Sequence, residues 1–500
     1  MSDPLLYEIN TRCWLHRLSD RYSAPITLAN IPADELARWR KLGFTHIWLM
    51  GVWAAGPLAR AKALQYSDLR RAYDQSLPGW RETDVAGSPY AIGDYQVPPA
   101  LGGEAGLAAF RRQLHAQGMK LVLDFVPNHL GLDHAWVREQ PELFVQSTGE
   151  AAGTFAQQSG GQIRWLAYGK DPYFPPWTDT VQLDYRRDTT RGAMTELLAS
   201  IARHCDGVRC DMAMLVLNGV FAKTWKHFPV TTSPPVEEFW TTAIARIRQA
   251  HPDFLFLAEA YWGLEPELRR LGFDYTYDKT LYDHLIAHDA TDVQRHLLGL
   301  AAGQLAAGAH FLENHDEPRV AALLSLAEHR AAALCILGLP GMRFLHDGQL
   351  EGARIKIPVQ LARVAPEAGQ SEIQALYQQL LGTLPGTAVG RGRAVLCQPR
   401  AAWSGNPTAA NLIIVQWQQQ TPEFDLVVVN LAPHRSQCYV PLSVPQLAAR
   451  SWVMKDLLGS ECYQRAGDDL QTQGLYLDLP PHGAQLFHFQ PGELVKGARL

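Results

Sequence analysis

Two residues of one short apolar run, Arg209 and Asp211, have the types and the spacing for nucleophilic or acid–base chemistry. The run, Gly207-Val-Arg-Cys-Asp211, is typical of a strand, where side chains two residues apart point to the same face. An arginine beside a carboxylate keeps it ionised at neutral pH, and an ionised carboxylate held in place can act as a nucleophile. A structural ion pair on a strand is the alternative, so the functional interpretation depends on similar groups elsewhere in the chain.

Three further carboxylates occur in comparable places. Asp124 ends the run Lys120-Leu-Val-Leu-Asp124, Glu259 ends Phe254-Leu-Phe-Leu-Ala-Glu259, and Asp316 lies in Glu313-Asn-His-Asp-Glu-Pro-Arg319. Carboxylates at the ends of neighbouring strands converge on one pocket, where mutual repulsion and partial burial separate their pKa values. One can then stay protonated while another stays ionised, as retaining glycoside hydrolysis requires of two carboxyl groups about 5–5.5 Å apart.

A divalent-metal site and a rim of salt bridges are competing interpretations of these carboxylates. The nearby histidines, His129 and His315, occur singly and lack the His-x-x-x-His spacing of many catalytic metal sites. We therefore predict no metal ligand among these residues.

The elements that must position the carboxylates are predicted as strands alternating with helices. Strand, helix and strand in that order are typical of a parallel α/β fold, and eight such units in about 250 residues or more fit a (β/α)₈ barrel with its chemistry at the carboxyl ends of the strands. The predicted strands span residues 5–10, 45–50, 120–124, 207–211, 254–259, 273–277, 310–313 and 341–345. Helices are predicted from residue 31 and over 103–118, 190–204, 236–250, 279–302, 319–337 and 371–384.

Three domains follow from these patterns. The catalytic barrel comprises residues 1–129 and 186–384, with residues 51–89 as a long loop after the second strand. Residues 130–185 are rich in Gly, Pro, Trp and Tyr with weak periodicity, which indicates an irregular subdomain inserted after the third strand. Residues 385–500 contain short runs of β-branched and aromatic residues between Gly, Pro and Asn, which predict a separate antiparallel β-sandwich.

The composition limits the classes of partner. The chain has 500 residues, of which 47% are hydrophobic, so it can bury a large core. A net charge of -5 without a cluster of lysines or arginines argues against nucleic acid and anionic membranes. The 14 tryptophans, 17 tyrosines and 17 phenylalanines suit the apolar faces of sugar rings, although most belong to the core. Candidates for either role in loops are Trp53, Trp80, Trp165 and Trp177.

The cysteines and the N-terminus favour the cytoplasm. The seven cysteines are scattered without a Cys-x-x-Cys pair, which predicts reduced, buried thiols. The N-terminus lacks the basic start and apolar core of a signal peptide, and no run approaches a membrane-spanning length. We therefore expect a cytoplasmic protein.

Four stretches together resemble the four sequence regions of the α-amylase superfamily, glycoside hydrolase family 13. They are Asp124-Phe-Val-Pro-Asn-His129, Gly207-Val-Arg-Cys-Asp211, Phe256-Leu-Ala-Glu259 and Phe311-Leu-Glu-Asn-His-Asp316, in order and at suitable separations. The resemblance covers nearly the whole chain, and four ordered motifs are highly specific. It implies the barrel, the insertion after the third strand and a retaining mechanism.

The resemblance implies a role for each acidic residue. Asp211 would be the nucleophile, Glu259 the general acid/base and Asp316 the residue that binds the hydroxyls of the distorted sugar. Arg209 would hold Asp211 ionised, and Asp124 would orient its neighbours rather than react.

Three further residues would contact the sugar in the −1 subsite by the same resemblance. His129 and His315 would hydrogen-bond it, and Tyr90, from a stretch similar to the family's Gly-Tyr-x-x-x-Asp-Tyr element, would stack beneath its ring. A satisfied structural histidine and a core aromatic are the respective alternatives.

Departures from the family pattern narrow the expectation. Many starch-degrading members carry a Lys-His pair after the nucleophile, where this chain has Met214 and Leu215, so a long-chain endo-amylase is disfavoured. The stretch Phe256–Ala260 is similar to that of maltosyl-transferring members, and Asn314–Glu317 is similar to that of trehalose synthase-like isomerases.

Two flanking positions allow more than one interpretation. Glu317 and Arg319 could meet a sugar hydroxyl, a phosphate or a carboxylate, which makes Arg319 a candidate substrate-binding residue, or they could pair with each other. Asn128 occupies the place of a calcium ligand in calcium-binding family members and is equally suited to capping a loop. No cofactor is required, and calcium is the one addition that the resemblance allows.

The first functional hypothesis is a retaining α-glycoside hydrolase whose substrate is a short α-glucan or α-glucoside oligosaccharide. The second is the same chemistry with a sugar acceptor, in a transglycosidase or isomerase, since exclusion of water decides between them. A non-catalytic glucan-binding protein is the third, and it is disfavoured because Asp211, Glu259 and Asp316 are all present.

Overall fold

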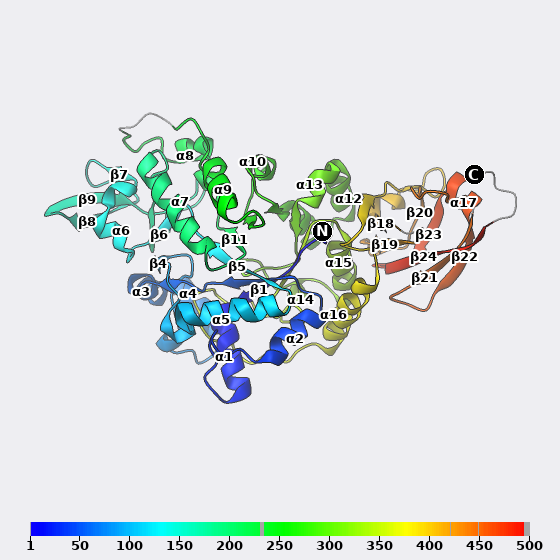
Figure 1. The fold of residues 1–500 in the computed structure, drawn as a ribbon, viewed down its shortest axis with the longest axis horizontal. Helices are drawn as coiled ribbons and strands as arrows, with labels where there is room; N and C mark the ends of the chain where they lie inside the picture. The colour runs from blue at the N-terminus through cyan, green and yellow to red at the C-terminus, as the bar shows by residue number, and fades with distance from the viewer. Residues whose placement is uncertain (1, 231–234, 421, 449, 495–500) are drawn as a thin grey trace.

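A closed barrel of eight parallel strands forms the centre of the protein, as seen in a computed structural model that describes residues 2–230, 235–420, 422–448 and 450–494 (Figure 1). The strands follow one another around the barrel in the order β1-β15-β14-β13-β12-β11-β5-β2. They are β1 (Leu5–Asn10), β2 (His46–Met50), β5 (Lys120–Phe125), β11 (Gly207–Cys210), β12 (Leu255–Ala258), β13 (Tyr275–Tyr277), β14 (Gly308–His310) and β15 (Met342–His346). The predicted (β/α)₈ barrel is confirmed.

The barrel strands are apolar because both of their faces are buried. Alternate side chains belong to different cores: Leu6 and Trp48 pack in one cluster with Phe344, whereas Tyr7 and Ile47 belong to the larger cluster shared with the helices. This alternation is the two-residue period of a strand, and it directs every second residue into the barrel.

Helices surround the barrel and cover the outer faces of its strands (Figure 1). They include α1 (Thr11–Tyr22), α2 (Ala33–Lys41), α5 (Gly103–Ala116), α7 (Asp188–Ala202), α8 (Asn218–Thr224), α9 (Phe239–Ala250), α10 (Glu265–Arg270), α11 (Lys279–Ile286), α12 (Ala290–Gly299), α13 (Ala302–Ala306), α14 (Val320–Leu323), α15 (Leu326–Gly338) and α16 (Ser371–Thr383). In the parts of the chain described, no helix combines the length and the apolar character needed to cross a bilayer.

Two local predictions about the barrel were wrong. Residues 51–89 are not a loop, because they contain α3 (Pro57–Gln65) and α4 (Ser67–Ser76). The α3 sequence has proline at its first turn followed by strong helix formers, which overrides the surrounding glycines and prolines. The seventh strand ends at His310 and does not reach Glu313. The prediction extended it because Phe311 and Leu312, which are buried in the following loop, have the apolar character of a strand.

The inserted subdomain after β5 is small and irregular, as predicted. It contains β6 (His129–Gly131), α6 (Ala135–Glu139), β7 (Gln146–Ser147), β8 (Thr154–Ser159), β9 (Gln162–Ala167) and β10 (Thr180–Gln182). A three-stranded sheet, β7-β9-β8, projects at the end of the molecule opposite the C-terminal strands, and β10 pairs with β6 beside the barrel (Figure 1).

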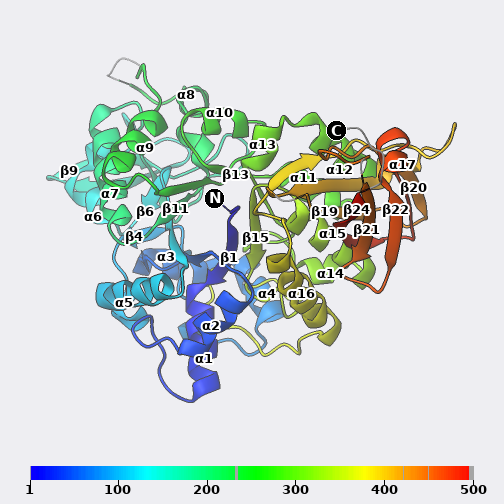
Figure 2. The ribbon, with the colours of Figure 1, turned by 45° about the vertical axis from the view of Figure 1, so that its right-hand side comes forward.

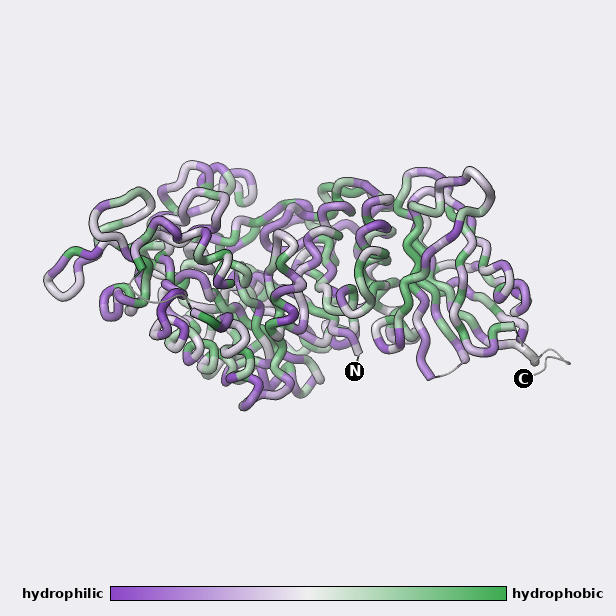
Figure 3. Tube along the Cα trace, turned by 90° about the horizontal axis from the view of Figure 1, so that it is seen from above, coloured by the Kyte–Doolittle hydropathy of each residue, from purple (hydrophilic) through white to green (hydrophobic). Residues whose placement is uncertain are grey.

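The C-terminal domain is an antiparallel β-domain with two sheets, in the orders β16-β18-β19-β24-β21-β22 and β17-β20-β23. Its strands are β16 (Arg393–Leu396), β17 (Arg400–Ala401), β18 (Leu412–Gln418), β19 (Phe424–Asn430), β20 (Ser436–Val440), β21 (Arg450–Asp456), β22 (Cys462–Ala466), β23 (Leu475–Leu479) and β24 (Ala484–Leu494), with α17 (Gly467–Thr472) between them. Hydrophobic stretches run along these strands and hydrophilic stretches lie on the outer loops (Figure 3).

Helix α15 joins the barrel to the C-terminal domain, and both ribbon views show it beside β19 (Figures 1 and 2). Trp417 donates from Nε1 to the backbone oxygen of Gly338 over 2.8 Å. The absence of a side chain at Gly338 leaves room for Val427, since a Cβ there would lie 2.6 Å from a methyl group of that valine.

The cysteines are free, and six of the seven are buried. Cys462 is exposed, so the prediction of buried thiols was wrong at that residue. It lies on β22, the last strand of its sheet, where side chains alternate toward solvent.

Candidate active site

The predicted carboxylates meet at the carboxyl ends of the barrel strands. Asp124 lies in β5, Asp211 and Glu259 directly follow β11 and β12, and Asp316 lies in the loop after β14. The ladder continues past the strands, because the backbone N–H of Asp211 donates to Phe125 and that of Glu259 donates to Cys210. The backbone therefore fixes both side chains at one mouth of the barrel.

Arg209 is the buried centre of this site. Its Nη1 donates to Oδ1 of Asp211 over 2.7 Å, and its Nη2 donates to Oε2 of Glu259 over 2.6 Å. The guanidinium is completely buried and lies over aromatic rings, which add cation–π attraction. The rings are those of Trp48 and Tyr90, each with its centroid 5.2 Å away, and of Tyr277 at 5.8 Å.

Glu259 has one oxygen suited to carry a proton. Its Oε2 accepts from Arg209 and from the backbone N–H of Met212, whereas Oε1 faces the hydroxyl of Tyr261 over 2.6 Å. Burial, with a smaller contribution from the charge of Asp211, raises the pKa of Glu259 to about 7 against the opposing charge of Arg209. A hydroxyl oxygen can accept a hydrogen bond, so a proton on Oε1 keeps its partner.

Asp211 and Asp316 have different surroundings. The side chain of Asp211 is only 9% exposed, and burial raises its pKa although Arg209 opposes the shift. The side chain of Asp316 is 51% exposed, and its Oδ2 lies 2.9 Å from Nε2 of His315. Desolvation opposes ionisation of Asp316, but the charge and hydrogen bond of His315 outweigh it and lower the pKa of Asp316.

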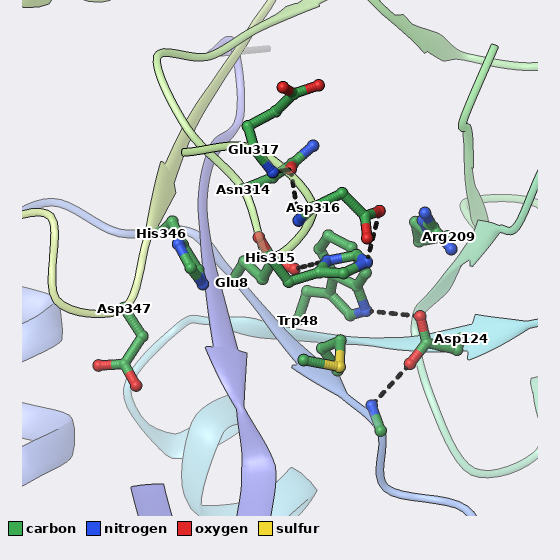
Figure 4. A network of polar contacts seen from close by, with 12 residues as sticks. Glu8, Trp48, Asp124, Arg209, Asn314, His315, Asp316, Glu317, His346 and Asp347 are labelled. Atoms are coloured by element: carbon green, nitrogen blue, oxygen red, sulfur yellow. Dashed lines mark hydrogen bonds and ion pairs between the residues drawn. The ribbon is translucent and has the colours of Figure 1, made fainter. Parts of the chain in front are cut away.

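Both carboxylate oxygens of Asp124 accept hydrogen bonds from β2 and from the residue that follows it. Oδ1 accepts from Nε1 of Trp48 over 3.1 Å, and Oδ2 accepts from the backbone N–H of Gly51 over 2.9 Å (Figure 4). Burial raises the pKa of Asp124 to about 6. These contacts fit the orienting role that the resemblance implies.

Tyr90 and His315 pack together beside the carboxylates. Their rings stack with centroids 5.3 Å apart, and the Tyr90 hydroxyl lies 2.9 Å from Nε2 of His315. Nδ1 of His315 contacts the carboxylate of Glu8, which comes from β1 (Figure 4). The two carboxylates, Asp316 and Glu8, raise the pKa of His315 well above its ordinary value despite burial, which favours the cationic form of this histidine.

His129 has the opposite character. It is buried in β6, packs 5.1 Å from the ring of Trp177, and lies beside the side chain of Asn128. Burial lowers the pKa of His129 to about 4, so it is neutral at pH 7. The two predicted sugar-binding histidines are therefore a neutral one and a cationic one.

The charged residues after Asp316 pair, but not with each other. Arg319 is buried and donates from Nη1 to Glu313 over 2.6 Å and to the backbone oxygen of Asp347 over 2.7 Å. Glu317 forms an ion pair with Lys279 at 3.4 Å. Arg319 thus supports the loop that carries Asp316, with Nη1 committed to protein acceptors.

The positions that departed from the family pattern are apolar in structure as well. Met214 and Leu215 are both buried, so they present no charged group to a sugar. The side-chain oxygen of Asn128 accepts a hydrogen bond from Nε2 of Gln182 over 2.9 Å. A hydrogen-bond donor beside this oxygen fits a structural amide better than a ligand of a bound cation. Among the residues that the structure describes, no group of three or more His, Cys, Asp or Glu side chains could hold a metal ion.

The predicted aromatic candidates serve packing in part. Trp53 is buried and donates from Nε1 to the backbone oxygen of Asp124 over 2.8 Å. Trp80 donates to Asp74 and packs edge-on against Tyr73. It belongs to a small hydrophobic cluster that contains none of the predicted carboxylates. Trp177 packs its ring against that of His129, another predicted site residue.

Comparison with known proteins identifies the family. The family model for the α-amylase catalytic domain matches residues 33–374, which is more than half of the chain. The chain belongs to the α-amylase family. By the resemblance of the sequence regions, its three motif carboxylates at the mouth of the barrel would occupy the family's catalytic positions.

Individual relatives of this α-amylase-family protein are distant. α-Amylase MalA of Haloarcula japonica is 26% identical over 284 residues, which cover 55% of this chain and 38% of MalA. An α-1,4-glucan:maltose-1-phosphate maltosyltransferase of Cereibacter sphaeroides is 30% identical over 210 residues, which cover 41% of this chain and 29% of that enzyme. The matched segment spans less than half the length of these curated relatives.

Solved structures share the fold along the whole chain. Maltogenic α-amylase AmyB of Thermotoga neapolitana superimposes with a TM-score of 0.66 at 18% identity, covering 97% of this chain and 98% of its own. An α-amylase of Lactobacillus plantarum superimposes with the same TM-score at 21% identity, also covering 97% of this chain and 98% of its own. At such identities the likeness shows the fold.

Several residues of this α-amylase-family site were missed in the sequence. Glu8 is the only charged residue of its apolar run, and a lone buried charge of this kind is a signal that could have found it. Tyr261 follows Glu259 by two residues and had no such signal. Lys356 donates from Nζ to the backbone oxygen of Asp316, and only the fold brings these two together.

Proposed function

We propose that this α-amylase-family protein is a retaining α-glycoside hydrolase acting on short α-glucans or α-glucosides. The observation that carries the proposal is the arrangement of Asp211 and Glu259 on one guanidinium, together with the burial that raises the pKa of Glu259 to about 7 and lets it hold a proton near neutral pH. Opposite protonation states of two adjacent carboxyl groups are what double displacement requires.

In the first step, a carboxylate oxygen of Asp211 attacks the anomeric carbon. The bond from that carbon to the glycosidic oxygen breaks, and the oxygen keeps the electron pair and takes the proton from Glu259. A covalent glycosyl ester on Asp211 and a free sugar alcohol result. In the second step, ionised Glu259 takes a proton from water, whose oxygen displaces Asp211 and restores both carboxyl groups.

The −1 sugar would be held by groups of complementary character. Asp316 is the most exposed of the three motif carboxylates, and its low pKa makes it an anionic acceptor for two sugar hydroxyls. Tyr90 is half-buried and presents a ring over Arg209. Hydrogen bonds that strengthen as the ring flattens stabilise the transition state more than the substrate.

A wall beside Asp316 supports short substrates. A cavity of about 520 Å³ lies next to Asp316 and His315, and it is lined by α4 and by residues 355, 356 and 358–360 of the segment after β15. That segment is fastened to the chain before β4 (Ile92–Asp94), since Arg363 makes two hydrogen bonds to Asp84, of 2.9 and 2.8 Å, and Leu361 pairs with Val85. Because these contacts hold the segment after β15 in place, it limits the space for a long glycan chain beside Asp316.

The second candidate is transfer to a sugar acceptor, and one observation favours it. Trp262 follows Glu259 by three residues, is 41% exposed, and packs edge-on at 4.9 Å against Tyr173 of the inserted subdomain. Tyr173 and its neighbour Phe174 are 62% and 69% exposed. An exposed aromatic surface beside the acid/base suits the apolar face of an acceptor sugar.

Product analysis tests the proposal. Wild type and Asp211→Ala are incubated with maltooligosaccharides, maltose, trehalose and sucrose, with and without phosphate, and every product is resolved by chromatography. Shorter sugars alone, absent with the variant, support hydrolysis, whereas longer, isomerised or phosphorylated sugars support transfer. Equal inertness of wild type and variant across this panel would contradict the proposal and favour a binding protein.

A paired variant separates the two candidates. Trp262→Ala should lower the ratio of transfer to hydrolysis if the aromatic surface binds an acceptor, and it should leave simple hydrolysis nearly unchanged. Trp403, which is 56% exposed in the C-terminal domain, provides the matched control as Trp403→Ala.

A further inference from the structure

A carboxylate from the first barrel strand contacts the imidazole ring of His315. Glu8 of β1 is completely buried and touches Nδ1 of His315, 307 positions away in the sequence. Barrel closure makes this contact, because β1 lies between β2 and β15 and Glu8 pairs in register with Trp48 and His346. Its second oxygen, Oε2, has no hydrogen-bond partner among the residues that the structure describes.

The contacts of His315 with two carboxylates favour a ring that is protonated at both nitrogens. A neutral imidazole has one N–H and one lone pair, so it cannot donate from both ring nitrogens. His315 meets a carboxylate at each nitrogen, Glu8 at Nδ1 and Asp316 at Nε2, the latter over 2.9 Å. Two carboxylate acceptors are satisfied only when both nitrogens carry protons.

We propose that Glu8 is a positioning residue. Its carboxylate accepts from Nδ1–H of His315 and thereby holds the ring with Nε2–H directed at Asp316 and Tyr90. The inference deepens the proposed function and rests on it, since Asp316 is the residue that grips the sugar hydroxyls there. Glu8 does not face the substrate and acts through His315. Without Glu8, the imidazole can lose its Nδ1 proton or turn over, and Nε2 then presents a lone pair to Asp316 for part of the time.

The packing around His315 supports one orientation of the ring. Trp48 meets it edge-on with centroids 5.7 Å apart, and Tyr90 stacks on it at 5.3 Å. Between these walls the ring can slide little, so the hydrogen bond at Nδ1 decides which atom faces the site. Figure 4 shows His315 between Glu8 and Asp316, with a dashed line from the histidine to each carboxylate.

Other charges reach His315 but do not replace Glu8. Its positive charge opposes part of the rise in pKa that burial causes at Asp124 in β5 and at Asp211 after β11. Lys356, from the segment after β15, binds the backbone of Asp316. The titratable or charged groups that face the histidine are thus Glu8, Tyr90, Asp124, Asp211 and Asp316, with Arg209 beyond the ring of Tyr90 and Lys356 beyond Asp316.

The experiment measures the histidine and the reaction separately. The imidazole resonance of His315 is identified by NMR as the one missing from His315→Gln, and it is followed between pH 5 and 9 in wild type and in Glu8→Gln. The glutamine keeps the size and the acceptor oxygen of Glu8 and removes its charge. On the same proteins, kcat and KM are measured against pH with the best substrate of the product analysis.

Wild-type His315 is expected to stay protonated across the neutral range, whereas in Glu8→Gln it titrates there, nearer the ordinary value of about 6.5. In the variant, kcat should fall about 10–100-fold on the alkaline side, the worth of one charged hydrogen bond, and recover toward acid pH, with a smaller change in KM. Adding Glu8→Gln to His315→Gln should cost little more than His315→Gln alone, because the two residues act as a unit.

Three results would overturn the inference. If His315 of the wild-type protein titrates at its ordinary pKa, the inference is overturned by that result alone, without any variant. A Glu8→Gln protein with an unchanged His315 titration, or with a loss of kcat equal at every pH, would make Glu8 a core residue only. Since the NMR titration requires no turnover, it decides the role of Glu8 even if no substrate is cleaved.

Two further variants guard the conclusion. If Glu8→Gln does not fold, Glu8→Asp keeps the charge on a shorter side chain and should keep His315 protonated while lowering kcat; a His315 that titrates normally in this variant would contradict the inference. Asp425→Asn removes the carboxylate of another buried pair, with His488 at 2.7 Å in the C-terminal domain, and should leave the pH profile unchanged.

Discussion

Nη2 of Arg209 lies 2.6 Å from Oε2 of Glu259, so the arginine binds the proposed acid/base as well as the proposed nucleophile, Asp211. Oε2 is thereby committed to N–H donors, which leaves Oε1 as the oxygen that can carry and deliver a proton. The same guanidinium lies between two carboxylates of different tasks, and its burial makes both interactions stronger than they would be in water.

Leaving-group chemistry should separate the roles of Glu259 and Asp211. Glu259→Gln should lower kcat on natural α-glucosides by about 10²–10⁴-fold, the usual contribution of a general acid. On an aryl α-glucoside with a nitrophenol leaving group, which needs no proton, its first step should remain fast and give a burst of nitrophenol. Asp211→Asn should show no burst on either substrate. A burst with Asp211→Asn would contradict the assignment of the nucleophile.

The pH profile of kcat/KM should fall on the alkaline side near pH 7. Burial raises the pKa of Glu259 to about 7, so the proton needed by the leaving group is present below that pH and lost above it. The hydrogen bond from Tyr261 opposes this shift by stabilising the carboxylate. Tyr261→Phe should therefore move the alkaline limb to higher pH, and a shift to lower pH would contradict the assignment.

Asp124→Ala should destabilise the barrel. It leaves Nε1 of Trp48 and the N–H of Gly51 buried without their acceptor, at about 1–3 kcal/mol for each group. Denaturation by guanidinium chloride measures the change. Asp68→Ala removes an exposed ion pair with Arg71 and should leave the free energy of unfolding almost unchanged, because solvent screens such a pair. Similar losses in the two variants would show that Asp124 is not the support described.

Gly338→Ala should weaken the junction between the barrel and the C-terminal domain. Alanine favours a helix by about 1 kcal/mol over glycine, but overpacking against Val427 should cost about 1–3 kcal/mol and exceed that gain. The double variant Gly338→Ala, Val427→Ala should be more stable than the sum of the two single changes predicts. Gly382→Ala in α16, where a Cβ would meet nothing within 4 Å, should be neutral or stabilising. A simple additive loss would contradict the steric explanation.

The sequence by itself determined the barrel and the positions of its carboxylates. Apolar runs of strand length recur between helical segments, and a residue at the end of a parallel strand must lie at the mouth, whatever the rest of the fold does. The parity of Arg209 and Asp211 likewise sets them on one face, and the structure has them 2.7 Å apart. The site residues carried over by motif resemblance were found in the same way, because the motifs are local.

Only the tertiary structure decided which residues support the site. Glu8 and His315 meet because the first strand closes the barrel beside the last, and no local period reports a contact across 307 positions. Arg319 pairs with Glu313, whereas Glu317 pairs with Lys279 of α11, a residue that is distant in the sequence. Local patterns specify backbone conformation and the side to which a residue points, whereas the partner it meets there depends on how distant segments are brought together.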